Sequence, residues 1–186
     1  MNFEFPEDFF EEEEEQIPND SIPILLMGLD GSGKTALFQN FVYGDYTNKP
    51  KSTWLLGHFT FKFDEKLVFL QELGGRYRFM EKWENYYPGK KGLIWVVDSI
   101  DRGRIIESQE VLDKLLLNND LKELPVLIIF NKQDGKYKMT DEFIHQYFYD
   151  EHYHDKNVKI IKTSFYTLEN VYEGFDWLIK QILTNK

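Results

Sequence analysis

The chain has 186 residues, enough for one domain with a sizeable core, and 42% of them are hydrophobic and 29% charged, as in globular proteins generally. It contains no cysteine, which excludes a disulfide framework, a thiolate metal site and the attachment of prenyl or palmitoyl chains. The first 20 residues carry nine acidic side chains and no lysine or arginine, so the net charge of −10 lies mostly there. Nucleic acids and anionic membranes are polyanions, and we expect neither to bind this segment.

Residues 1–21 form an acidic N-terminal arm that we expect to be flexible. The run Glu11 to Glu15 repels itself, and Pro6 and Pro18 interrupt any long helix. The alternative is that aromatic side chains of the arm dock on a groove or a partner; these are Phe3, Phe5, Phe9 and Phe10. The sequence has no signal peptide and no apolar run near the ~20 residues that span a bilayer. We therefore expect a cytoplasmic protein that reaches membranes through partners.

From Ile22 onward, short apolar runs alternate with longer amphipathic segments. This alternation predicts one α/β domain over residues 22–186, with a mostly parallel sheet and helices on both faces. Strands are expected at residues 22–28, 58–63, 66–73 and 92–98, within 124–134, and at 158–164. Helices are expected at residues 34–44, 104–118, around 140–150, and 170–185.

The first expected strand and helix are joined by GLDGSGKT, which runs from Gly28 to Thr35 and fits the phosphate-loop pattern G-x-x-x-x-G-K-[ST]. Small residues let backbone N–H groups curl around a β-phosphate, and the helix N-terminus reinforces them. Lys34 would place its charge on the β- and γ-phosphates, and the Thr35 hydroxyl would bind Mg²⁺. A chance glycine turn is the alternative, but the strand before the motif and the helix after it favour a phosphate site.

A carboxylate, two glycines and an arginine follow the apolar run of residues 67–70; these are Glu72, Gly74, Gly75 and Arg76. Thr53 lies between the phosphate loop and the expected hairpin, where its hydroxyl could close onto Mg²⁺ when a γ-phosphate is present. A single threonine is uninformative by itself.

The sequence NKQD, from Asn131 to Asp134, ends the strand expected within residues 124–134, where α/β sheets present ligand-binding loops. The Asp134 carboxylate could accept hydrogen bonds from guanine N1–H and N2–H₂, which adenine lacks; such a bidentate contact discriminates by roughly 1–3 kcal/mol. Ser164 and Phe165 follow the last strand, where backbone N–H groups could meet guanine O6. Each motif alone also fits an ordinary helix start, but NKQD together with the phosphate loop favours guanine over adenine.

These motifs resemble the Arf and Arf-like family of small GTPases over residues 22–183. The likeness rests on GLDGSGKT, ELGGRYRFMEKWENYY, GLIWVVDSIDRGRI, FNKQD and ENVYEGFDWLI. It implies the P-loop NTPase fold of Ras-like small GTPases with a six-stranded sheet, binding of GTP, GDP and Mg²⁺, and a role in vesicle or membrane trafficking. It also implies effector proteins at residues 52–87, an exchange factor and a GTPase-activating protein. We expect a monomer that binds no nucleic acid.

Three groups of site residues follow from the motifs and the resemblance. The residues expected to bind nucleotide are Gly28, Asp30, Gly31, Ser32, Gly33, Lys34, Thr35, Gly75, Asn131, Lys132, Asp134, Ser164 and Phe165. The residues expected at the metal are Thr35, Thr53 and, through water, Glu72. The residues expected in catalysis are Lys34 and, at an altered position, Arg76.

The chain departs from the family pattern at several of these positions. Asn2 stands where much of the family carries a glycine for myristoylation, so we expect no lipid anchor. Gln71 replaces a tryptophan of the effector-facing surface, and Leu55 and Leu56 occupy toggle and effector-facing positions of the first switch. Glu72 replaces an aspartate and is one methylene longer, so it could shift the metal or reach it directly.

Arg76 stands at the position of the family's catalytic glutamine. A guanidinium donates hydrogen bonds and accepts none, whereas orienting a water nucleophile requires an acceptor. It could still stabilise negative charge on a γ-phosphate. Three hypotheses follow: a guanine-nucleotide switch with slow hydrolysis, an inactive nucleotide-bound scaffold that acts as a protein-interaction module, or a P-loop phosphotransferase or ATPase. NKQD argues against the third.

Overall fold

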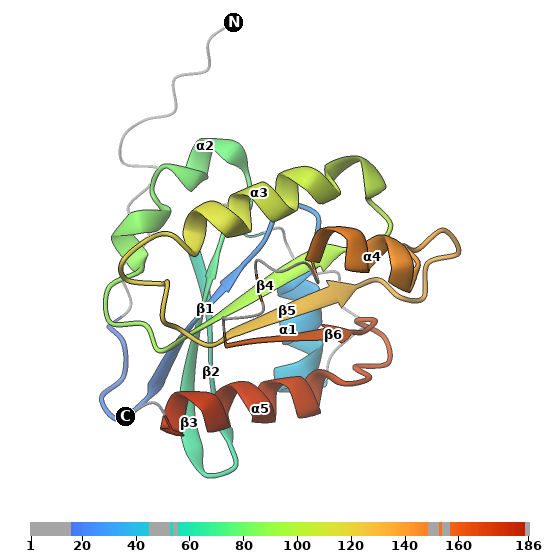
Figure 1. The fold of residues 1–186 in the computed structure, drawn as a ribbon. Helices are drawn as coiled ribbons and strands as arrows, with labels where there is room; N and C mark the ends of the chain where they lie inside the picture. The colour runs from blue at the N-terminus through green and yellow to red at the C-terminus, as the bar shows by residue number, and fades with distance from the viewer. Residues whose placement is uncertain (1–15, 45–52, 54–55, 149–152, 154–156, 185–186) are drawn as a thin grey trace, which may run out of the picture.

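A computed structural model describes residues 16–44, 53, 56–148, 153 and 157–184. At its centre lies a six-stranded sheet with the order β2-β3-β1-β4-β5-β6 (Figure 1). The strands are β1 (Ile22–Met27), β2 (Leu56–Phe63), β3 (Lys66–Leu73), β4 (Gly92–Asp98), β5 (Val126–Asn131) and β6 (Val158–Lys162). Among these strands, β2 and β3 pair antiparallel and every other neighbouring pair is parallel. The predicted α/β fold with a mostly parallel six-stranded sheet is confirmed.

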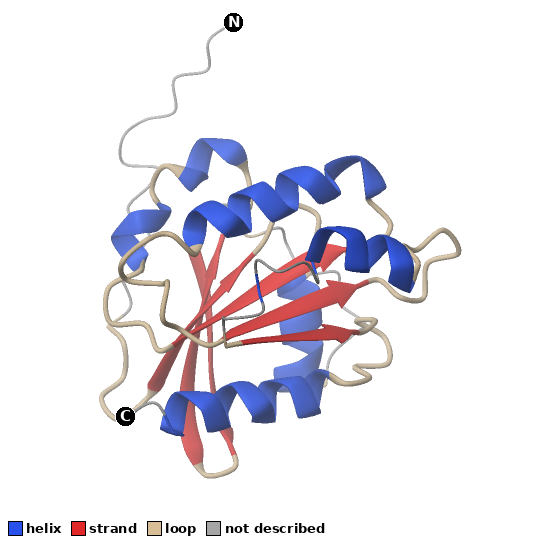
Figure 2. Ribbon diagram, in the orientation of Figure 1, coloured by secondary structure: helices blue, strands red, loops and turns tan. Residues whose placement is uncertain are grey.

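Helices cover both faces of the sheet (Figures 1 and 2). One face carries α1 (Lys34–Tyr43) and α5 (Val171–Thr184), and the other carries α2 (Tyr77–Met80), α3 (Ile105–Leu115) and α4 (Asp141–Phe148). Two short 3₁₀ turns, η2 (Trp83–Tyr86) and η3 (Arg102–Arg104), precede β4 and α3. None of the described helices has the length and apolar character needed to cross a membrane.

Each face of the sheet has its own apolar core. On the α3 and α4 side, Trp83 packs edge-on against Trp95 with ring centroids 6.4 Å apart. On the α1 and α5 side, Phe38 and Phe63 contact Phe175 with centroids 6.2 and 4.9 Å apart. Because both faces are covered, the central strands are apolar without alternation, and all six residues of β5 are buried. Much of the aromatic content therefore serves the core.

The element boundaries differ from the expected ones in detail. The hairpin turns at Asp64 and Glu65, whose positive φ angles of 43° and 63° match the two-residue turn that suits twisted strands. Helix α3 ends at Leu115, three residues before the expected end, and the chain continues into turns in which Leu117 is exposed. Residues 1–15 and Leu55 lie outside the described residues, so the division into arm and domain stays a prediction.

Candidate functional site

The phosphate-loop segment connects β1 to α1 at the edge of the sheet where the carboxyl ends of the parallel strands meet. Two of its glycines are required by close packing as well as by positive φ. A Cβ on Gly28 (φ 144°) would lie 2.3 Å from the Val96 carbonyl oxygen, and one on Gly33 (φ 87°) would lie 2.6 Å from Asn131 Nδ2. The loop is therefore pressed against the ends of β4 and β5.

Lys34 is buried at the first position of α1, and its side chain folds back into the loop. Its ammonium donates hydrogen bonds to the carbonyl oxygens of Gly28 and Leu29 at 2.9 and 3.0 Å, which leaves one N–H for an anion. Burial lowers the pKa of Lys34 to about 8, although the nearby negative charges of Glu72 and Asp30 oppose that shift. The amine therefore still carries its charge at neutral pH.

The three residues expected at the metal lie together, although they come from different parts of the chain. Thr35 Oγ1 donates a hydrogen bond to Glu72 Oε1 at 2.6 Å and lies 3.0 Å from Thr53 Oγ1. Burial raises the pKa of the Glu72 carboxyl, and the Lys34 charge and hydrogen bonds from both threonines oppose that shift. Octahedral Mg²⁺ with ligands at 2.0–2.1 Å places adjacent oxygens about 3 Å apart, so the spacing of the two threonine hydroxyls fits such an ion.

The glycine pair after β3 packs directly on the phosphate loop. The Gly75 carbonyl accepts a hydrogen bond from the Asp30 N–H at 3.1 Å, and a Cβ on Gly75 would lie 2.4 Å from that nitrogen. Trp83 Nε1 donates to the Gly74 carbonyl at 3.1 Å and fixes the segment from the other side. Arg76 is the next residue after Gly75 and directly precedes the first turn of α2.

The NKQD segment is bound to the phosphate loop through two side chains. Asn131 Nδ2 donates to the Ser32 carbonyl at 2.9 Å, and Lys132 Nζ donates to the Gly31 carbonyl at 2.7 Å. Lys132 also forms a 2.6 Å ion pair with Asp98 at the end of β4. The buried Oδ1 atom of Asn131 has no hydrogen-bond partner within the described part of the chain. Buried polar atoms of this kind are often completed by a ligand or water.

The second expected base loop, which follows β6, meets NKQD, which follows the neighbouring strand β5. Ser164 Oγ donates to Asp134 Oδ1 at 2.6 Å, and the Gln133 N–H donates to the Thr163 carbonyl at 3.0 Å. Asn40 of α1 donates to the Phe165 carbonyl at 2.6 Å, which ties this loop to the phosphate helix. Asp134 is exposed, and a carboxylate has about four acceptor positions, so it keeps acceptors for a base.

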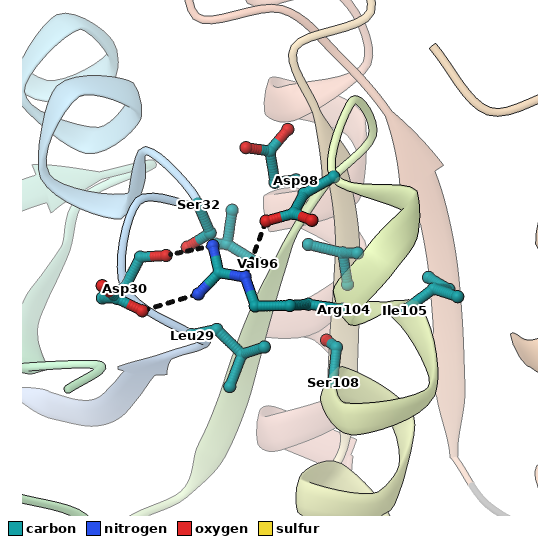
Figure 3. Close-up of a pocket in the computed structure, with 10 residues that line it drawn as sticks. Leu29, Asp30, Ser32, Val96, Asp98, Arg104, Ile105 and Ser108 are labelled. Atoms are coloured by element: carbon teal, nitrogen blue, oxygen red, sulfur yellow. Dashed lines mark hydrogen bonds and ion pairs between the residues drawn. The ribbon is translucent and has the colours of Figure 1, made fainter. Parts of the chain in front are cut away.

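Sequence reasoning assigned no role to Arg104, which the structure places against the phosphate loop. Its guanidinium donates to Asp30 Oδ1 at 2.7 Å, to the Asp30 carbonyl at 3.1 Å and to Asp101 Oδ2 at 2.6 Å. Figure 3 shows the contacts between Arg104 and Asp30, both of which line a small pocket between the loop and α3 together with Ser32. The only signal was the basic sequence DRGR after β4, which does not identify a partner 74 positions away.

Comparisons with known proteins agree with this arrangement. Residues 11–182 match the model of the ADP-ribosylation factor family. The chain is 31% identical over 163 residues to ADP-ribosylation factor J of Dictyostelium discoideum, covering 88% of this chain and 86% of that protein. It is 34% identical over 160 residues to ADP-ribosylation factor-like protein 2 of Arabidopsis thaliana, covering 86% of each.

Among solved structures, the Arl6 BBS3 small GTPase from Trypanosoma brucei, with bound nucleotide analogue GppNp, superposes with a TM-score of 0.80. The alignment covers 89% of this chain and 99% of that one at 24% sequence identity. The small-GTPase fold that the family resemblance implied is confirmed.

Proposed function

Because the chain belongs to the ADP-ribosylation factor family, we propose that it is a guanine-nucleotide switch that binds GTP and GDP with Mg²⁺ and hydrolyses GTP slowly. The observation that carries this proposal is that the expected phosphate site and the expected base site are joined by hydrogen bonds. Asn131 and Lys132 hydrogen-bond to the phosphate loop, while Asp134 of the same segment faces solvent with free acceptor capacity. A base at Asp134 and phosphates at Lys34 would be two ends of one molecule.

Guanine specificity rests on Asp134 and its partner Ser164. The hydroxyl holds one carboxylate oxygen, and this fixes the orientation of the group that would face the base. A carboxylate accepts two hydrogen bonds from guanine, whereas adenine would leave it desolvated without a partner. Backbone N–H groups near Phe165 would complete the recognition at guanine O6.

The donor set formed by Thr35, Thr53 and Glu72 suits Mg²⁺, which prefers hard oxygen ligands. When bound, the ion would neutralise charge on the phosphates. Thr35 and Thr53 would hold it with their hydroxyls, and Glu72 would supply a negative charge beside it. Since Thr53 lies in the first switch, its hydroxyl would connect that segment to the phosphate site.

Slow hydrolysis follows from Arg76, which stands where family members carry the water-orienting glutamine. The Gly75 carbonyl contacts the phosphate loop, so the residue after it begins next to the site. Its guanidinium and the Lys34 ammonium would both stabilise phosphate charge, but neither accepts a proton from water. This combination favours binding of GTP over its hydrolysis.

We further propose that residues 52–87 contact effector proteins and that these partners direct the protein to membranes in vesicle trafficking. An exchange factor and a GTPase-activating protein would set the nucleotide state, as in the family generally. Residues 1–21 would form an arm outside the nucleotide-binding domain of residues 22–186.

The nucleotide carried by the protein tests this function directly. Protein purified without added nucleotide and then denatured should release GDP or GTP in nearly equimolar amount, identified by ion-exchange chromatography against standards. The Lys34→Ala variant, purified in parallel, should release far less because it lacks the phosphate-binding charge. Release of ATP or ADP in place of guanine nucleotides would contradict the proposal, as would failure of GDP and GTP to bind when added.

A further inference from the structure

Asp30 places a carboxylate in the loop that is expected to bind phosphates, where a negative charge is unfavourable. The negative charge of Asp30 is felt in the binding site, since it favours the charged form of the buried Lys34 amine. The Asp30 backbone is fixed as well, since its N–H donates to the Gly75 carbonyl. A free carboxylate at this position would repel a nucleotide phosphate.

Arg104 neutralises this carboxylate and holds it in a fixed direction. One guanidinium edge spans both the Asp30 side chain, at 2.7 Å, and the Asp30 carbonyl, at 3.1 Å. The Nε–H donates to Asp101 at 2.6 Å, and this second ion pair holds the arginine from the α3 side. Arg104 therefore has a defined orientation, and the Asp30 carboxylate is drawn toward α3.

We propose that Arg104 is a positioning residue for nucleotide binding: by pairing with Asp30 it keeps the carboxylate of the phosphate loop neutralised and directed away from the bound phosphates. The proposal rests on the nucleotide-binding function proposed above. It assigns Arg104 no contact with the ligand, and its effect passes entirely through Asp30.

A contribution to folding alone does not account for this arrangement. About a third of the Arg104 side chain and half of the Asp30 side chain are exposed, and such ion pairs contribute little to stability. The Asp30 charge also acts on the nearby Lys34 ammonium, which is expected to contact the phosphates. An electrostatic role also predicts sensitivity to salt, which a packing role does not.

The experiment is a double-mutant cycle on the affinity for a fluorescent GDP analogue at low ionic strength. Arg104→Gln should raise the dissociation constant by roughly tenfold, because it leaves the Asp30 carboxylate uncompensated near the phosphates. In an Asp30→Asn background, the same change at Arg104 should alter the constant by less than about twofold, since no charge remains to be neutralised. Arg104→Lys, which keeps the charge, should retain most of the affinity.

Arg102→Gln is the matched control, because it removes the same charge two residues away, where the guanidinium donates to the Lys138 carbonyl. Arg102→Gln should leave GDP affinity within about twofold of the unmodified protein. Added salt should reduce the effect of Arg104→Gln on GDP affinity, and it should produce no such effect in Arg102→Gln. Equal effects of the two arginine variants, or an undiminished effect of Arg104→Gln in the Asp30→Asn background, would overturn the inference. If the unmodified protein binds no GDP at all, the proposed function itself is wrong.

Discussion

The Asp134 carboxylate accepts a 2.6 Å hydrogen bond from the Ser164 hydroxyl, which lies 30 positions later in the chain. The two loops that carry these residues follow neighbouring strands, since β5 and β6 pair in parallel. Parallel pairing brings their carboxyl ends to the same edge of the sheet. The orientation of the Asp134 carboxylate, and with it recognition of the base, would therefore depend on a contact that forms only in the folded sheet.

Replacement of Asp134 by Asn should change base preference. The new amide presents a donor to guanine N1–H or N2–H₂, so GTP affinity should fall by about tenfold or more, as expected for loss of a contact that contributes roughly 1–3 kcal/mol. Xanthosine triphosphate, whose C2 carbonyl can accept from the amide, should gain relative to GTP. Competition against a fluorescent GDP analogue measures both changes. Equal competition by ATP and GTP in the unmodified protein would show that the guanine assignment is wrong.

The pH dependence of binding should report on Lys34, whose pKa is lowered to about 8 by burial. Phosphates favour the charged amine, so GDP affinity should fall as the pH rises from about 7 to about 9.

The free energy of unfolding of the nucleotide-free protein should change with pH in the opposite direction, because it depends on the same Lys34 amine. Between about pH 8 and 10.5 the unfolded chain holds a proton that the folded chain has lost, so this group's contribution to the free energy of unfolding rises with pH. Both dependences should be absent in Lys34→Gln, and their persistence there would assign them to another group.

Removal of divalent cations should accelerate release of GDP if Thr35 and Glu72 belong to a metal site. Excess EDTA should speed dissociation of a fluorescent GDP analogue severalfold in the unmodified protein, because uncompensated phosphate charge is then left beside Glu72. Thr35→Ala lacks one of the hydroxyl ligands, so its release should already be fast and should respond less to EDTA. Release rates that are unaffected by EDTA in the unmodified protein would argue against the metal site.

Anionic membranes should not retain the protein by themselves. The first 20 residues carry nine acidic side chains and no basic ones, so an anionic surface should repel them. We expect little cosedimentation with phosphatidylserine-containing liposomes in either nucleotide state. Strong cosedimentation that depends on GTP would contradict this, and substitution of Phe9 and Phe10 by serine would then test whether the arm supplies the contact.

Local patterns were sufficient to predict the sheet and the phosphate loop. The apolar runs of β1, β4 and β5 are continuous because both faces are covered, and the glycines of the loop follow a fixed spacing. The contact between Asp134 and Ser164 was not among these predictions, because it depends on the parallel pairing of β5 with β6. The family resemblance, in contrast, was needed to identify the position of Arg76.

Contacts between charged groups on distant segments were not predictable in the same way. From the sequence, Arg104 could pair with any surface carboxylate. Its ion pair with Asp30 forms because α3 packs against the phosphate loop. The direct hydrogen bond between Thr35 and Glu72 likewise depends on the position of β3 beside β1. The end of α3 at Leu115 was missed because the apolar run LLL continues past the residues that pack on the core.

The central claim concerns Arg76, and single-turnover hydrolysis of bound GTP tests it most directly. Protein loaded with GTP and supplied with Mg²⁺ should hydrolyse it slowly, because a guanidinium cannot accept a proton from the attacking water. Arg76→Gln should raise the rate by roughly tenfold or more, since it restores an acceptor. Adding Glu72→Asp should raise it further and non-additively. Absence of hydrolysis in all variants would favour an inactive scaffold, and rapid hydrolysis by the unmodified protein that Arg76→Gln leaves unchanged or abolishes would contradict the account.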